Sequence, residues 1–180
     1  SDLLTEAMSA RPIVVLGDVG VGKTSFFENL FQKLSEQDET SSLFVHINLG
    51  TQGATSESLK NLVLNRISEE IRNQTGINIR SASFVRSLYY RDVQEFSESI
   101  YGHLRTSDPA GYESRLTEML EQKILDHSAH THASLGHLSR GQGYKVILVI
   151  DNADQRSYET QQEAFLIAQE FATFRHSLVF

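Results

Sequence analysis

Residues 17–25 read Gly-Asp-Val-Gly-Val-Gly-Lys-Thr-Ser, so glycines, a lysine and a hydroxyl residue stand at the spacing G-x-x-x-x-G-K-T. Glycines let a backbone curl until its N–H groups point inward at an anion. Lys23 adds a positive charge for the outer phosphates of a nucleotide, and the Thr24 hydroxyl can ligate Mg²⁺. The pattern predicts a phosphate-binding loop made of Gly17, Asp18, Val19, Gly20, Val21, Gly22, Lys23, Thr24 and Ser25.

The residues on either side place this loop between a strand and a helix. The apolar run 13–16 comes directly before it. Apolar residues then recur at helical spacing between Phe26 and Leu34. We therefore expect a strand at 12–16 and a helix that begins at Gly22. The positive end of that helix would face the bound phosphates.

A second candidate site follows the apolar run 145–150, because Asp151 comes directly after it. An aliphatic run with no polar face is typical of a central parallel strand that is covered on both sides. Ligands bind beyond the carboxyl ends of the strands in such sheets, so Asp151 is expected to face the phosphate loop. We predict that Thr24 and Asp151 together hold Mg²⁺, with Asp151 acting through water.

Hydrolysis of a nucleotide also needs a group that orients the attacking water. The candidates for this task are three of the residues that follow Asp151, namely Asn152, Asp154 and Gln155. Asp154 is predicted to be catalytic together with Lys23. An aspartate at this place is equally suited to cap the next helix, and that alternative stays open.

The order of the expected elements indicates the fold class. Strands are expected at 12–16, 43–49 and 145–150 and again from Ser177, and helices separate them. This alternation is typical of a three-layer α/β fold, with a central parallel sheet, helices on both faces and right-handed crossovers. We expect one nucleotide-binding core domain over 1–180, with the strand order 2-3-1-4 and further strands.

Residues 51–143 are expected to form a helical insertion between the second strand and the strand that ends at Asp151. Apolar residues at helical spacing predict three helices within it and one after Asp151. The first helix is expected to start after Thr55 or Ser56 as its cap and to stop at Gly76; its apolar residues are Leu59, Val63, Ile67 and Ile71. Two further helical regions of the insertion span about 83–105 and 111–128. The helix after Asp151 spans 158–174, and its expected inward residues are Tyr158, Phe165, Ala168 and Ala172.

The end of this insertion, residues 128–143, is rich in serine, histidine and glycine and predicts a polar loop or a loose helix end. Four histidines lie in this segment or directly before it, namely His127, His130, His132 and His137. Histidines at such spacing can bind Zn²⁺ or Ni²⁺, but the chain has no cysteine and little carboxylate beside them. A solvated loop is the interpretation that we prefer.

The composition limits other kinds of function. The formal net charge of −7 does not indicate a nucleic-acid surface, and the absence of cysteine excludes disulfides and thiolate metal sites. No stretch approaches the roughly 18 uninterrupted apolar residues of a membrane span, and the N-terminal residues lack the pattern of a signal peptide. We expect a cytoplasmic protein with no membrane partner. The apolar run that ends at Phe180 suggests a fragment of a longer protein.

The segments GDVGVGKT and VILVIDNADQ resemble the Walker A and Walker B segments of the additional-strand P-loop ATPases. Within that class, Asp151-x-Ala153-Asp154 resembles the D-x-hydrophobic-D pattern of the STAND (NACHT-like) and KAP ATPases. The AAA+ initiator class usually has Asp-Glu at this point, and Asn152 departs from that pattern. KAP proteins often carry membrane helices between the two motifs, whereas the insertion here is amphipathic.

The resemblance implies a switch in signalling or defence that binds ATP or ADP with Mg²⁺ and hydrolyses ATP slowly. Its partners would be further domains of the same chain, second copies or other proteins. A polar sensor and a lid domain would lie beyond Phe180. Adenine is favoured over guanine by the resemblance and by the lack of a guanine-reading motif. The alternatives are a DNA-handling or initiator ATPase, a nucleotide or small-molecule kinase, and a scaffold that stays locked on ADP.

Overall fold

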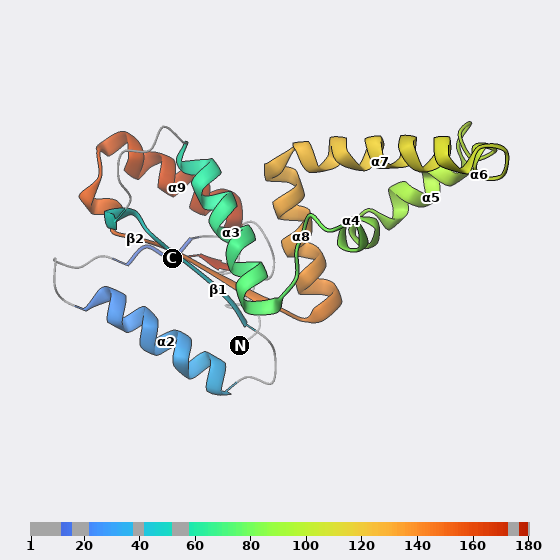
Figure 1. The fold of residues 1–180 in the computed structure, drawn as a ribbon. Coiled ribbons are helices and arrows are strands. Elements are labelled where there is room, and N and C mark those ends of the chain that lie inside the picture. The colour runs from blue at the N-terminus through green and yellow to red at the C-terminus, as the bar shows by residue number, and fades with distance from the viewer. Residues whose placement is uncertain (1–11, 16–21, 38–41, 52–57, 173–176, 180) are drawn as a thin grey trace, which may run out of the picture.

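In the part of the chain that the structure describes, three parallel strands and their covering helices hold the segments that carry the candidate site (Figure 1). The computed structural model describes residues 12–15, 22–37, 42–51, 58–172 and 177–179. The elements are α2 (Lys23–Gln37), β1 (Ser42–Asn48), the 3-10 turn η1 (Leu49–Thr51), α3 (Leu59–Thr75), α4 (Ala82–Leu88), α5 (Tyr90–Glu98), α6 (Leu104–Ser107), α7 (Pro109–Leu125), α8 (His127–Gln142), β2 (Lys145–Asp151), the 3-10 turn η2 (Ala153–Gln155), α9 (Tyr158–Ala172) and β3 (Ser177–Val179).

The central strand of the described sheet is β2, which pairs in parallel with β1 on one side and with β3 on the other. The edge of β2 opposite β1 is therefore occupied by β3 over Val146–Leu148. The predicted order 2-3-1-4, which puts the strand 12–16 beside β2, is wrong. Residues 12–15 have no regular secondary structure here.

Side chains alternate between the two faces of β1 and β2 and so separate two apolar cores. Val45 and Leu148 are buried on the face that α3, α8 and α9 cover. Val149 points to the opposite face, where Phe27 of α2 packs against it. Helices on both faces confirm the predicted three-layer α/β fold (Figure 1). Asp151 lies two residues after Val149 and so stands on the α2 face, at the carboxyl end of β2.

The insertion between β1 and β2 consists of α3 and α8, which lie against the sheet, and of an arm formed by α4, α5, α6 and α7 (Figure 1). The arm projects away from the sheet and has an apolar core of its own. The buried members of that core are Val85, Tyr112, Leu116 and Leu120. This arrangement confirms the predicted helical insertion between the two strands.

The region predicted to be helical at 83–105 is helical, but it is divided into three short helices. Ser99 ends α5 with an extended backbone (ψ −179°). Its hydroxyl donates to the carbonyl of Phe96 at 2.7 Å and accepts the N–H of Tyr101 at 3.2 Å. A serine that bonds its neighbours in this way competes with helical hydrogen bonds. In the described residues, every helix falls short of what crossing a membrane requires.

The polar loop or loose helix end predicted at 128–143 is also wrong, because residues 127–142 form one regular helix, α8. Asp126 caps the helix by accepting the N–H of Ala129 at 3.0 Å, and Gly143 ends it with a φ of +72°. His130 is fully buried. Its Nε2 donates to the Ile79 carbonyl at 2.9 Å. Polar residues on the buried face hide the helical pattern from a hydrophobicity analysis. The described residues contain no metal-binding cluster of histidines and carboxylates.

Two smaller predictions about helices need correction. The cap of α3 is Ser58, whose hydroxyl accepts the N–H of Asn61 at 3.3 Å, rather than Thr55 or Ser56. In α9, Ala168 and Ala172 are buried as expected. Tyr158 and Phe165, however, are 69% and 46% exposed, so they do not face inward.

Lowering the pH from about 7 to about 5 is expected to destabilise the fold through His130. Burial lowers the pKa of His130 below its ordinary value of 6.5, and the hydrogen bond to Ile79 only partly opposes this. The unfolded chain therefore takes up a proton at a higher pH than the folded chain does. The contribution of neutral His130 to the free energy of unfolding is complete above pH 6.5. As the pH falls from 6.5 towards the lowered pKa of the folded state, the free energy of unfolding decreases by up to about 1.4 kcal/mol per pH unit.

Urea unfolding at the two pH values would measure this effect in the wild type and in His130→Gln. The variant should show a shallower fall in the free energy of unfolding. Part of the fall should remain, because burial also lowers the pKa of His132 and outweighs its hydrogen bond with Glu170. Equal pH dependence in the two proteins would contradict the assignment to His130.

Candidate nucleotide and metal site

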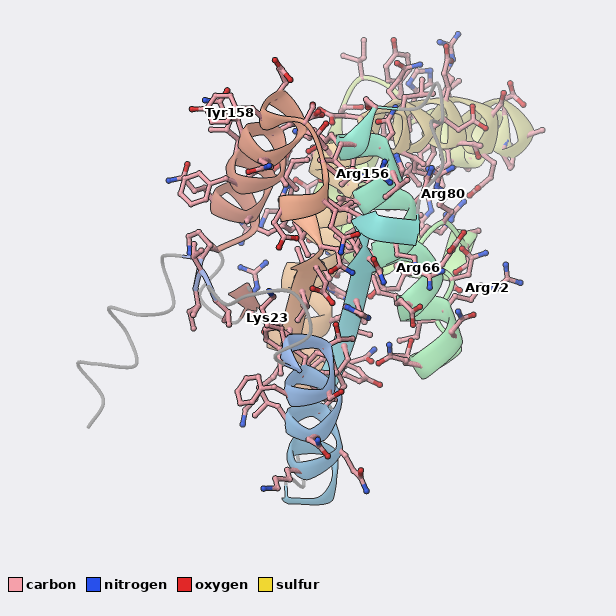
Figure 2. The ribbon with its side chains drawn as sticks, turned by 90° about the vertical axis from the view of Figure 1, so that its left-hand side faces the viewer. Lys23, Arg66, Arg72, Arg80, Arg156 and Tyr158 are labelled. Atoms are coloured by element: carbon pink, nitrogen blue, oxygen red, sulfur yellow. The ribbon has the colours of Figure 1, made fainter. Side chains whose placement is uncertain are left out.

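The end of the predicted phosphate loop leads directly into α2. Gly22 has a φ of +86°, in the left-handed region that glycine adopts without strain. Its carbonyl accepts the N–H of Phe26 at 2.9 Å, and this bond closes the first turn of the helix. Lys23 and Thr24 are the first residues of α2. Figure 2 labels Lys23 at the start of that helix. The predicted loop residues 17–21 lie outside the described residues.

The structure brings the two predicted metal-binding residues together. Thr24 Oγ1 donates a hydrogen bond to Asp151 Oδ2 at 2.7 Å, across 127 positions of sequence. The Asn152 N–H donates to the other carboxylate oxygen, Oδ1, at 2.8 Å. Asp151 is only 6% exposed. The two donors hydrogen-bonded to it are a hydroxyl and an amide, and neither balances its negative charge.

A divalent cation fits this arrangement. Burying a carboxylate is costly unless a positive charge or a metal compensates it. Mg²⁺ prefers oxygen ligands and keeps several of its waters, so one hydroxyl and one nearby carboxylate are a suitable donor set. The chemistry of Thr24 and Asp151 therefore matches the metal that the sequence predicts.

Lys23 lies beside the candidate catalytic carboxylate. Its Nζ is 3.9 Å from Asp154 Oδ2, and the two side chains are 19% and 54% exposed. Asp154 belongs to η2, and it does not cap α9. The hydroxyl of Ser157 has that position, because it accepts the N–H of Thr160 at 3.4 Å. The alternative role of Asp154 as a helix cap is therefore wrong.

The other two water-positioning candidates are bonded elsewhere. Asn152 has a φ of +59°, and its side-chain amide donates to Asn48 Oδ1 at 2.8 Å. Gln155 Nε2 donates to Asn152 Oδ1 at 3.2 Å. Asn48 also accepts the N–H of Gly50 at 2.8 Å. These bonds tie η2 to the end of β1 and leave Asp154 as the candidate whose carboxylate faces Lys23.

Arg156 strengthens the same connection. Its Nε donates to the Leu49 carbonyl at 2.7 Å, and its Nη2 donates to the same oxygen. The guanidinium therefore positions η1, at the end of β1.

A cavity of about 290 Å³ opens beside these groups. Its polar end contains Lys23 and the residues from Asp151 to Asp154. Its apolar walls are Pro12, Ile13, Val14, Val15, Phe27, Ile150, Ala164, Phe165 and Ala168, with Gln161 among them. Small-molecule sites have this character, with apolar walls and a few polar groups at one end.

Sequence reasoning missed two residues of β1 that border the site, His46 and Asn48. His46 Nε2 lies 3.4 Å from Asp151 Oδ2. The register pairs His46 with Val149 and Asn48 with Asp151. The sequence pattern that could have indicated them is the alternation of polar and apolar residues near the end of β1, where His46 and Asn48 alternate with apolar residues. It becomes informative only once the pairing with β2 is known.

A comparison with protein families agrees with this geometry. The family model of the AAA domain matches residues 6–179, which is almost the whole chain. No curated protein and no solved structure matches the chain. The match spans both the loop that leads into α2 and the strand that ends at Asp151. The chain therefore belongs to the AAA domain family of P-loop NTPases.

Proposed function

We propose that this domain binds ATP together with Mg²⁺ where α2 meets the carboxyl end of β2. The observation that supports this most is the 2.7 Å hydrogen bond between Thr24 and Asp151. It joins the hydroxyl of the phosphate-loop motif to the acidic residue at the strand end. These are the two groups that a P-loop site offers to the metal.

Each residue of the site has a separate task in this proposal. The N–H groups at the start of α2 and the Lys23 ammonium hold the phosphate oxygens. Bound Mg²⁺ would neutralise charge that develops on the transferred phosphoryl group. Thr24 supplies a hydroxyl oxygen, and Asp151 keeps its carboxylate beside that hydroxyl. The Asn152 N–H fixes the orientation of the carboxylate.

We assign the positioning of the attacking water to Asp154. Its carboxylate is exposed and lies beside Lys23, whereas Asn152 and Gln155 are bonded to each other. A carboxylate within hydrogen-bond reach of a water can orient it and accept its proton. The proposal therefore includes ATP hydrolysis by this domain, at the slow rate expected of a nucleotide-dependent switch.

The switch itself is proposed from the contacts around η2. The bonds from Asn152 to Asn48 and from Arg156 to Leu49 join η2 to the end of β1. A change at Asp154 on hydrolysis would therefore be transmitted to η1 and the end of β1. The Asp151-x-Ala153-Asp154 pattern resembles the D-x-hydrophobic-D pattern of the STAND-type ATPases. On that basis, we propose a signalling or defence ATPase whose partners are further domains or second copies.

Asp151→Asn is expected to remove most of the effect of Mg²⁺ on ATP binding. The variant keeps the size of the side chain and loses the charge that attracts the cation. Calorimetric titration with ATP, in Mg²⁺ and in EDTA, would measure the effect in both proteins. GTP titration and phosphate release, run in parallel, report base preference and turnover. Asp92→Asn removes an equal charge from α5 in the arm and serves as the matched control.

Two results would contradict the proposal. The first is wild-type ATP binding that is equal with and without Mg²⁺. The second is an Asp151→Asn variant that keeps the full effect of Mg²⁺. Tight ADP binding with no phosphate release would favour the scaffold locked on ADP over the hydrolysing switch.

A further inference from the structure

We infer that His46 is a positioning residue for Asp151. The His46 ring donates a hydrogen bond from Nε2–H to Oδ2 of Asp151 and so holds that carboxylate in place. This inference rests on the proposed Mg²⁺ site and assigns a third side chain beside its two metal-binding residues, as a positioning group. Neither the phosphate-loop motif nor the residues after Asp151 assign any role to this histidine.

The strand register places His46 at the site. In the parallel pair of β1 and β2, His46 is paired with Val149, and Asn48 is paired with Asp151. Paired residues stand on the same face of a sheet, so the His46 ring shares the α2 face with Asp151. Its Nε2 lies 3.4 Å from Asp151 Oδ2, the oxygen to which Thr24 donates.

The burial of the ring nitrogen argues for a bond between the two groups. His46 Nε2 is buried, and within the described residues it makes no hydrogen bond that satisfies both distance and angle. A buried polar atom without a partner carries a desolvation penalty. A small rotation of the ring or the carboxylate would bring 3.4 Å into the hydrogen-bonding range of about 2.7–3.2 Å. The proton must then be on Nε2.

A second donor at Oδ2 has a clear use. Thr24 has another task in the proposed site, since its hydroxyl oxygen is the one offered to Mg²⁺. The Asn152 N–H fixes only the opposite oxygen, Oδ1. His46 can hold Oδ2 without taking part in metal binding. Partners of this kind orient the groups that serve a metal, and their loss typically weakens metal affinity by about 10-fold to 100-fold.

The test compares His46→Leu with His46→Gln, whose amide nitrogen reaches the place of Nε2. The measured quantity is the Mg²⁺ concentration that gives half of the gain in ATP affinity. His46→Leu should need at least about 10-fold more Mg²⁺, while His46→Gln should stay within about threefold of the wild type. ATP binding in EDTA should be unchanged in both variants. Phe44→Leu is the matched control, because Phe44 stands on the same face of β1 and packs against Phe31.

A wild-type dependence on Mg²⁺ in His46→Leu would overturn the inference and leave the proposed function intact. A wild type without Mg²⁺-dependent ATP binding would instead contradict the proposed function. In that case the nitrogen NMR spectrum of the histidine rings in the nucleotide-free protein still tests the hydrogen bond. A proton on His46 Nε2, shifted by Asp151→Asn, is the expected signature. A ring with its only proton on Nδ1 would overturn the inference.

Discussion

Lys23→Ala is expected to weaken the binding of Mg²⁺·ATP by about 100-fold or more. The ammonium group supplies charged hydrogen bonds to the outer phosphates, each worth about 1.5–3 kcal/mol. The Lys23 side chain is only 19% exposed, so little water replaces it when it is removed. Alanine favours helix, and the first turn of α2 should therefore persist. Calorimetry would measure the affinity, and thermal unfolding would verify the fold.

Lys33→Ala provides the matched control for this result. Lys33 is an exposed lysine of the same helix, and its removal changes the net charge by the same amount. Its ATP affinity should remain close to that of the wild type. If Lys23→Ala bound ATP as well as Lys33→Ala, the phosphate contact assigned to Lys23 would be wrong.

Asp154→Ala is expected to lower the rate of phosphate release by about 100-fold or more, because the attacking water loses its acceptor. ATP binding should change little, since Asp154 is exposed and is not among the groups assigned to the phosphates. The fold should also tolerate the change, because the side chain does not cap α9. Single-turnover phosphate release at saturating ATP would separate the chemical step from binding.

Gln155→Ala tests the neighbouring candidate in the same turn. Its rate should stay close to the wild-type rate, because Gln155 is bonded to Asn152. Asn152→Gly removes the third candidate at a position whose φ of +59° glycine accepts. If Asp154→Ala kept its rate while either of these variants lost it, the assignment of the water to Asp154 would be contradicted.

The parts of the site that could be predicted from the sequence depend on residues close together in the chain. Gly22 needs its left-handed backbone to turn into α2, and the spacing of Lys23 and Thr24 from it places both in the first helical turn. Asp151 follows a short β-branched and aliphatic run that is typical of a buried strand. The general rule that ligands lie beyond carboxyl strand ends then predicts that Thr24 and Asp151 meet.

The parts that could not be predicted depend on pairing between distant segments. Strand propensity predicts where strands occur but not which edge each one joins, so the position of β3 beside β2 was missed. The helix α8 was missed because His130 and Ser134 are buried through hydrogen bonds rather than through apolar character. The role of His46 could be recognised only from the strand register, which brings its ring next to Asp151.

A double-mutant cycle between Thr24 and Asp151 tests the central claim most directly. Thr24→Val, Asp151→Asn and the double variant would be compared for the gain in ATP affinity that Mg²⁺ provides. Each single change should remove most of this gain, and the double change should cost little more, with a coupling of at least about 1 kcal/mol. Independent, additive losses would show that Thr24 and Asp151 do not serve one metal, and would contradict the site proposed here.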